Sequence, residues 1–290
     1  MAITQAMFTE VGERLYAEAL VDLPQDITQR IKEMRARETS EIARLQLDSI
    51  LENIALAKQR HSPICQDTAI SSYKIKIGTD AVIEGDIVAG ITQGTALATK
   101  KLPTIPHSVH PITKANTGTG TGNRTPLIHW DVVSGMDYVE VMGQPVGGGG
   151  DLCSAVKMFT GSAPMRDVKK FIIDTVVEAG CKPCPPMILG IGIGGMFETV
   201  SSLAKQAVMR PLDQRHPDKM IADLEDELLT SINKLGIGPM GLGGQTTALA
   251  VNIEHGNTGT SILPIAIKVH CWCLRRKIAR LYNDGTIEYL

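Results

Sequence analysis

The sequence predicts an α+β fold, in which a helical N-terminal region precedes mixed strands and helices in one globular unit. The first sixty residues are rich in helix formers, with apolar residues three and four positions apart. Later segments alternate apolar and polar residues with a period of two, which is typical of strands. Helical and strand segments do not alternate cleanly, which argues against a fold of repeated βαβ units.

The composition is that of a globular protein with a large core. The chain has 290 residues, of which 43% are hydrophobic and 21% charged. A net charge of −2 argues against a nucleic-acid binder, and no apolar run is long enough for a membrane span. The N-terminal segment lacks the pattern of a signal peptide, so we expect a cytoplasmic protein whose cysteines are thiols or metal ligands. We treat residues 1–290 as one domain, with a helical part over residues 1–60.

The elements of the first half follow from local patterns. Helices are expected over residues 4–60 and 84–100. The stretch SYKIKIG alternates, which predicts a strand with Tyr73, Ile75 and Ile77 on one face. The stretch NTGTGTGNRTP, residues 116–126, is too rich in glycine and threonine for regular structure. A loop of this length is usually functional or disordered.

The second half predicts more strands than helices. LIHWDVVSGMDYVEVMGQPV is interpreted as two strands around a Ser-Gly turn. Helices are expected over residues 166–179 and 218–234 and in MFETVSSLAKQAVM. Core strands are expected in PPMILGIGIGG, TTALAVNIE and ILPIAIKVHC, and a closing hairpin in ARLYNDGTIEYL.

The cysteines are the first candidates for chemistry. They stand at Cys65, Cys153, Cys181, Cys184, Cys271 and Cys273. One C-x-x-C and one C-x-C permit a structural zinc, although neither lies in a small loop-rich module. An iron–sulfur cluster also takes thiolates and accepts ligands far apart in sequence. The third interpretation is that several are buried thiols, which we favour for Cys153, Cys181 and Cys273.

Two glycine-rich stretches resemble nucleotide-binding motifs. Gly190, Gly192 and Gly195 satisfy G-x-G-x-x-G, and Asp213 stands near the expected acidic position. No second βαβ unit follows, so we expect these glycines to let backbone amides approach an anion or to permit close packing. GLGGQTTAL has Gln245 where a phosphate loop needs lysine, which excludes that motif.

A family resemblance rests on several of these motifs together. PICQDT, VHPITKANTG, GGGG, KPCPPMILGIGIGG, GIGPMGLGGQTTALAV, LPIAIKVHC and RR occur in this order over nearly the whole chain. Their combination resembles the α subunit, or N-terminal domain, of the class I iron–sulfur fumarase and L-tartrate dehydratase family. The resemblance implies a hydro-lyase that adds or removes water on a small hydroxy or unsaturated carboxylate.

The resemblance also implies a cofactor and the residues around it. Cys65, Cys184 and Cys271 would hold a [4Fe–4S] cluster whose fourth iron has no protein ligand and acts as a Lewis acid. Gln66 and Asp67, which follow the first cysteine, would line the site as catalytic residues. This would explain why an amide and a carboxylate stand beside Cys65.

Further implied contacts concern the substrate and a partner. Gln66, Gly148, Gly149 and Lys157 would contact the substrate, although a solvated surface position is the default expectation for Lys157 and for Lys114. A β subunit would complete the active site in an (αβ)2 assembly. No nucleic acid or membrane is expected as a partner.

Two positions depart from the family pattern. The family carries an arginine that grips a substrate carboxylate near the place of Ile105, and a proton-transferring histidine at the place of Gly259. We therefore expect an altered substrate. His107, His255 and His270 stand near these places in sequence and are candidates to replace the missing groups.

Two other functions are compatible with the same residues. A cluster-dependent lyase would remove a leaving group other than water. A non-catalytic iron–sulfur or zinc protein would serve as a scaffold or a sensor. The retained Gln66 and Asp67 favour catalysis, because a scaffold needs no carboxylate beside its cluster.

Overall fold

The structure is a computed structural model that describes residues 2–290. Its contacts divide the chain into two compact units. The first unit contains the chain up to Pro24, Asn53–Gly148 and Arg275–Leu290. The second contains Gln25–Glu52 and Gly149–Leu274. Each unit combines helices with a β-sheet, which confirms the α+β class. That residues 1–290 form one domain stays a prediction.

The N-terminal region is helical, as predicted. Its helices are α1 (Gln5–Val21), α2 (Gln25–Arg37) and α3 (Glu41–Arg60). The Thr4 side chain caps α1 by accepting a hydrogen bond from the Met7 amide. Within residues 2–290, no helix has both the length and the apolar character needed to cross a membrane.

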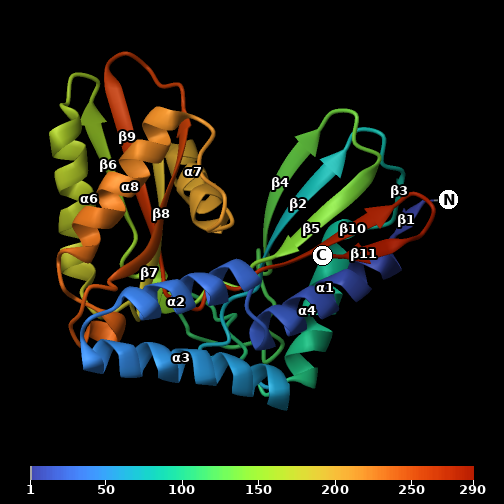
Figure 1. Ribbon diagram of the computed structural model, residues 1–290. Helices are drawn as coiled ribbons and strands as arrows, with labels where there is room; N and C mark the ends of the chain where they lie inside the picture. The colour runs from blue at the N-terminus through green and yellow to red at the C-terminus, as the bar shows by residue number, and fades with distance from the viewer. Residues whose placement is uncertain (1) are drawn as a thin grey trace. The chain divides into compact units, whose positions relative to one another are not determined.

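The sheet of the first unit has five strands in the order β11-β10-β5-β2-β4. Their bounds are Ser72–Gly78 for β2, Leu127–Val133 for β4, Tyr138–Gly143 for β5, Lys277–Tyr282 for β10 and Ile287–Tyr289 for β11. A short parallel pair, β1 (Ile3–Thr4) and β3 (Ile83–Glu84), forms a separate two-stranded sheet. Helices α1 and α4 (Ile87–Lys101) pack against the sheet (Figure 1), and Phe8, Tyr73 and Ile75 are fully buried in this core.

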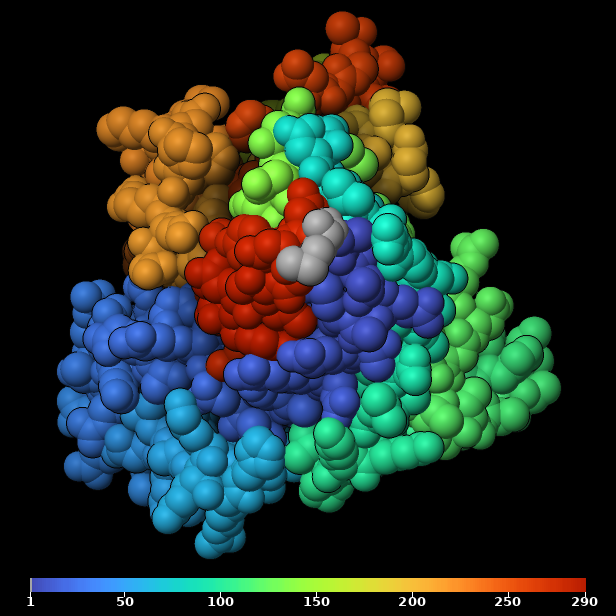
Figure 2. Space-filling view, turned by 90° about the vertical axis from the view of Figure 1, so that its right-hand side faces the viewer, coloured from blue at the N-terminus to red at the C-terminus, as the bar shows by residue number. Residues whose placement is uncertain are grey.

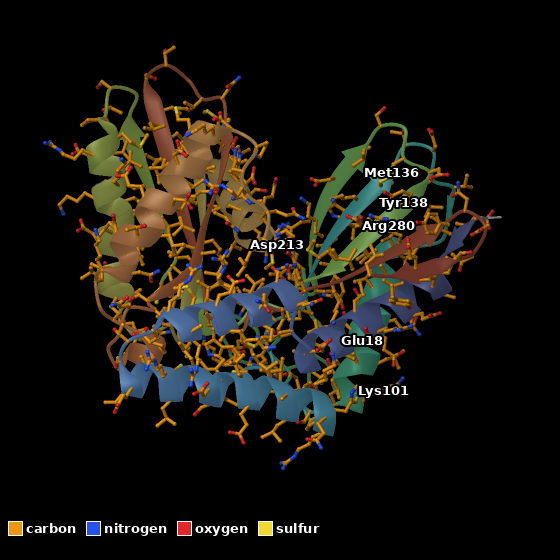
Figure 3. All side chains as sticks on the ribbon, viewed as in Figure 1. Glu18, Lys101, Met136, Tyr138, Asp213 and Arg280 are labelled. Atoms are coloured by element: carbon orange, nitrogen blue, oxygen red, sulfur yellow. The ribbon has the colours of Figure 1, made fainter. Side chains whose placement is uncertain are left out.

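The strands β4 and β5 do not pair with each other, although their sequence predicts two strands around a tight turn. Strand β2 lies between them, parallel to β4 and antiparallel to β5. The connection crosses the end of β2 at Gly78, where a Cβ atom would lie 1.9 Å from the carbonyl oxygen of Met136 (Figure 3). Glycine at position 78 therefore lets the connection pass over the strand.

The C-terminal hairpin β10–β11 is antiparallel, as predicted, and lies beside the N-terminal helix α1 (Figure 2). The Arg14 guanidinium stands 3.7 Å from the centre of the Tyr289 ring, and the Tyr289 hydroxyl donates to Glu10. On the sheet, Arg280 lies near the Tyr138 ring of the neighbouring strand (Figure 3). The two ends of the sequence therefore share one core.

The sheet of the second unit has four strands in the order β6-β9-β7-β8. Their bounds are Ala155–Thr160 for β6, Met187–Gly194 for β7, Ala248–Gly256 for β8 and Ile262–His270 for β9. The core side chains of β7 and β9 alternate between the two faces of the sheet. Helices α6 (Met165–Ala179) and α8 (Lys219–Asn233) cover one face, and α7 (Phe197–Met209) covers the other.

The glycines of β7 let α7 pack closely on the sheet. A Cβ atom at Gly190 would lie 2.2 Å from the carbonyl oxygen of Ala204, and one at Gly192 would lie 2.2 Å from that of Val200. This geometry supports close packing, the second of the two roles that we expected for this glycine motif.

A buried carboxylate in the second unit joins α2 and α3 to the loop that precedes β8. Glu38 accepts hydrogen bonds from the amides of Thr39 and Ser40, and from those of Gln245 and Thr246. It also accepts one from the Thr246 hydroxyl at 2.7 Å. Burial by itself raises the pKa of Glu38, but these hydrogen bonds outweigh it and hold that pKa below its ordinary value.

Candidate functional site

The CQDT segment forms a tight turn between α3 and β2 in the first unit. The buried Tyr16 hydroxyl of α1 supports it, because it lies 3.1 Å from the carbonyl oxygens of both Thr68 and Ala69. Burial raises the pKa of Tyr16 to about 12 despite the opposing charge of Arg275, so its hydroxyl stays a donor at neutral pH. Ala69 has a φ of 68°, which is rare for a residue with a side chain and marks the turn as constrained.

Backbone amides from two segments hold the carboxylate of Asp67. One oxygen accepts from the Ala69 amide and the other from the Gly148 amide, both at 2.9 Å. The bridge between Ile70 and Val146 aligns these segments. These two hydrogen bonds fix the orientation of the carboxylate, and a carboxylate oxygen that accepts one bond can accept another.

Gly147 and Arg275 complete the support of this turn. The Arg275 guanidinium donates to the backbone oxygen of Asp67 at 2.9 Å. A Cβ atom at position 147 would lie 2.9 Å from a carboxylate oxygen of Asp67 and 3.5 Å from the Arg275 guanidinium. Position 147 therefore has no room for a side chain.

A second segment brings a histidine to Asp67. The Thr68 hydroxyl donates to the carbonyl of Ile105 and accepts from its amide, at 3.1 and 2.9 Å. Two residues further on, the Nε2 atom of His107 lies 3.5 Å from the Oδ1 atom of Asp67. The Ile105 side chain itself is 53% exposed, so its backbone rather than its side chain joins the turn.

Cys65 and Gln66 lie at the start of the same turn. The half-buried thiol of Cys65 is 3.4 Å from the side-chain oxygen of Gln66, whose side chain is exposed. Hydrogen bonds within the first unit thus join three segments at this turn. They carry Cys65, Gln66, Asp67, His107 and Gly148.

In the second unit, two further predicted cysteines lie at one end of the sheet. Cys184 precedes β7, and Cys271 directly follows β9. These strands are antiparallel, and Ile188 near the start of β7 pairs with His270 at the end of β9. Cys184 adopts a φ of 53° in a turn closed by its amide on the Cys181 carbonyl.

Glycines surround this end of the sheet. The helical turn α5 (Gly148–Asp151) continues the glycine run, and a Cβ at Gly150 would lie 2.5 Å from the carbonyl oxygen of Val269. The short helix η1 (Pro239–Gly241) packs on the cysteine turn, because a Cβ at Gly241 would lie 2.4 Å from the Cβ of Cys181. These segments carry four of the motifs that were selected from the sequence.

An ion pair fixes the end of the glycine run. Lys268 of β9 contacts the carboxylate of Asp151. Burial lowers the pKa of Lys268 to about 8, and the group stays mostly charged at neutral pH, as its ion pair requires. Sequence reasoning gave neither residue a role.

Three of the residues selected from the sequence lie elsewhere in the second unit. The Lys157 ammonium lies 4.6 Å from the centre of the Phe159 ring on β6, and its register partner Ile265 is about 16 Å along β9 from His270. His255 stands at the far end of β8, beside His216. Gly259 precedes β9 and is separated from Cys271 by that nine-residue strand. Within one chain, position 259 therefore does not reach the end of the sheet that carries Cys271.

The cysteines within residues 2–290 have the right chemistry for a cluster. No group of three His, Cys, Asp or Glu side chains is placed to hold a metal ion there. The donor type nevertheless fits, because iron–sulfur clusters are held by thiolates and Cys184 and Cys271 share one end of a sheet. Cys273, in contrast, is buried.

Sequence reasoning missed most of the support around Asp67. Tyr16, Gly147 and Arg275 contact the turn from distant parts of the chain. The glycine run and the RR pair were visible as motifs, but no local pattern indicated which residue they would touch. Tyr16 has the appearance of an ordinary core residue of an amphipathic helix.

Comparison with known proteins gives a consistent family. A family model described as fumarate hydratase (Fumerase) matches residues 9–280. The chain is 39% identical over 282 residues to a protein named putative L(+)-tartrate dehydratase subunit alpha of Methanocaldococcus jannaschii, covering 96% of this chain and 99% of that protein. It is 31% identical to L(+)-tartrate dehydratase subunit alpha of Escherichia coli strain UTI89, covering 97% and 93%.

Proposed function

Because the chain belongs to the fumarate hydratase family, we propose that it is the α subunit of a hydro-lyase acting on a small hydroxy or unsaturated carboxylate. The chain aligns with 99% and 93% of the length of two relatives with names of this kind. The observation that supports the proposal best is the Asp67 carboxylate, held by two backbone amides in a half-exposed turn. Such a carboxylate is suited to accept a proton from a substrate carbon.

The proposed cofactor is a [4Fe–4S] cluster held by Cys65, Cys184 and Cys271. When bound, the cluster would supply a Lewis acid that weakens the bond between carbon and the leaving hydroxyl. Gln66, beside Cys65, would orient the substrate through its amide. Gly149 stays a candidate for backbone contacts to the substrate. The amide of Gly148 already donates a hydrogen bond to Asp67.

The partner is proposed from the same family. The names of the relatives include "subunit alpha", which implies a second subunit in those proteins. We propose a β subunit that completes the active site here, in an (αβ)2 assembly in the cytoplasm. Sedimentation of the two co-produced chains tests this assembly, and a lone α chain with full activity would contradict it.

The experiment for the activity uses the anaerobically purified αβ complex. We expect about four iron and four sulfide per α chain and dehydration of at least one hydroxy acid in a panel. Cys65→Ser, Cys184→Ser and Cys271→Ser should each lose iron, whereas the matched variants Cys153→Ser, Cys181→Ser and Cys273→Ser should keep it. A colourless complex that holds one zinc would instead support the scaffold alternative.

The substrate preference depends on position 105. An arginine there would grip a carboxylate, and a hydrogen bond to a charged group contributes roughly 1.5–3 kcal/mol. Fumarate and L-tartrate should therefore be poor substrates, and a substrate with an apolar group beside Ile105 should be better. Ile105→Arg should raise catalytic efficiency for fumarate about tenfold relative to the best substrate. If the unchanged enzyme already hydrates fumarate efficiently, position 105 does not control specificity.

A further inference from the structure

We propose, on the basis of the hydro-lyase function above, that His107 is the positioning residue of the Asp67 carboxylate. In this role the Nε2–H group of His107 donates a third hydrogen bond to that carboxylate and fixes its plane for proton transfer. The sequence made His107 one of three candidates to replace a missing group, and its contact with Asp67 comes from the structure. His107 thereby supplies an imidazole beside Asp67, although the family's histidine position holds Gly259 in this chain.

The Nε2 atom of His107 is buried and makes no hydrogen bond within normal geometry. The Oδ1 atom of Asp67 lies 3.5 Å from it. A buried nitrogen without a partner is unfavourable, so a small approach of the ring to Asp67 would satisfy it. Hydrogen bonds of catalytic groups are often long without substrate and shorten in the complex. Because a carboxylate only accepts, Nε2 must carry the proton in this contact.

The segment that carries His107 is held in place on both sides. The Thr68 hydroxyl holds the backbone of Ile105 through two hydrogen bonds. The side chain of Thr104 donates to the carbonyl of Thr99, and the side chain of Asn116 donates to that of Pro106 at 2.7 Å. Three consecutive residues before His107 are therefore anchored, and the position of its ring follows from the fold of this segment.

The hydrogen bonds of Asp67 also indicate which oxygen acts. Each carboxylate oxygen has about two acceptor positions. Oδ1 accepts from the Ala69 amide and faces Nε2 of His107 at 3.5 Å, whereas Oδ2 accepts from the Gly148 amide. With this one hydrogen bond, Oδ2 keeps its second acceptor position for a further contact. Oδ2 is therefore the oxygen that would accept the substrate proton.

The test compares His107→Leu and His107→Gln in the anaerobic αβ complex. Leucine removes the donor, whereas the glutamine amide keeps one at similar reach. His107→Leu should lower kcat about 10- to 100-fold with little change in KM, because a misplaced catalytic group costs rate rather than binding. His107→Gln should recover most of that loss. The control is His61→Leu, an exposed histidine of the same unit, which should leave kcat unchanged.

Two readouts separate the inference from the proposed function. If the unchanged complex dehydrates no hydroxy acid, the proposed function fails. If it is active and both His107 variants keep its kcat, or both lose it equally while folded with full iron content, the positioning role is wrong. Independently of activity, ¹⁵N spectra of the imidazoles should show the Nε2–H tautomer for His107 and a change in that signal in Asp67→Asn. The Nδ1–H tautomer would overturn the proposal.

Discussion

Two carboxylates, Asp67 in the first unit and Glu38 in the second, each accept backbone amides beside a glycine-rich segment, but they differ in how many partners they have. Glu38 is 1% exposed and accepts from four amides and one hydroxyl. The side chain of Asp67 is 33% exposed and accepts from two amides, with His107 at 3.5 Å.

The difference shows how a structural carboxylate is distinguished from a reactive one. Every acceptor position of Glu38 is occupied, so this group holds the loop before β8 in place and has no capacity for a ligand. Asp67 is held through its backbone and both oxygens, yet its side chain is 33% exposed and its Oδ2 atom accepts one amide and keeps an acceptor position. The comparison therefore predicts that changes at Asp67 affect rate and changes at Glu38 affect stability.

The largest expected effect is a fall in kcat in the Asp67→Asn variant. The amide cannot accept a proton from a substrate carbon, and general base catalysis typically contributes 10²- to 10⁴-fold. We expect kcat of the αβ complex to fall by about that factor, with the unfolding midpoint little changed. Glu38→Gln provides the matched carboxylate-to-amide change, and its folded fraction should keep kcat. Equal losses of kcat in both variants would remove the distinction.

The next effect is on stability in Glu38→Ala. This variant leaves the amides of Thr39, Gln245 and Thr246 without their acceptor in a buried place. Leaving buried donors unsatisfied costs about 1–3 kcal/mol each, less where water enters the cavity. We expect the free energy of unfolding in urea to fall by about 3 kcal/mol or more. Glu52→Ala, an exposed position on α3, should change it by less than about 0.5 kcal/mol.

A smaller effect is expected in Gly147→Ala. The new methyl group would lie 2.9 Å from the Asp67 carboxylate and must displace it or the segment that carries it. We expect kcat to fall about tenfold, because small displacements of a catalytic group are costly. Gly256→Ala is the control, since its Cβ would meet its nearest atoms at ordinary contact distances. Unchanged kinetics in Gly147→Ala would show that Asp67 is less tightly placed than its contacts indicate.

The smallest effect concerns acid stability. The pKa of Glu38 is lower in the folded protein than its ordinary value, so its stabilisation is present above the unfolded pKa, about 4.3. It is lost as the pH falls below that value through the folded pKa. The difference in unfolding free energy between the unchanged protein and Glu38→Gln should therefore narrow below about pH 4. A difference that stays constant from pH 6 to pH 3 would contradict this, and Glu52→Gln provides the control.

Much of the secondary structure followed from local pattern. The N-terminal helices, the β2 strand and the closing hairpin lie where apolar spacing and the Asp284-Gly285 turn predict them. The neighbours of β4 and β5 did not follow from local pattern. Strand β2, which comes earlier in the chain, lies between them and pairs with both. Local pattern identifies a strand, but partners far away in sequence decide its neighbours.

The sequence by itself determined the kinds of group that this protein uses: a cysteine with an amide and a carboxylate after it, a glycine run, and two further cysteine motifs. The order of these motifs along the chain also indicated the family. Only the tertiary structure decided that Asp67 meets His107 and the Gly148 amide, and that Gly259 stands at the other end of β9 from Cys271. The physical reason is that hydrogen bonds such as those of Thr68 to Ile105 join segments that have no local relation, and such contacts leave no periodic signal in the sequence.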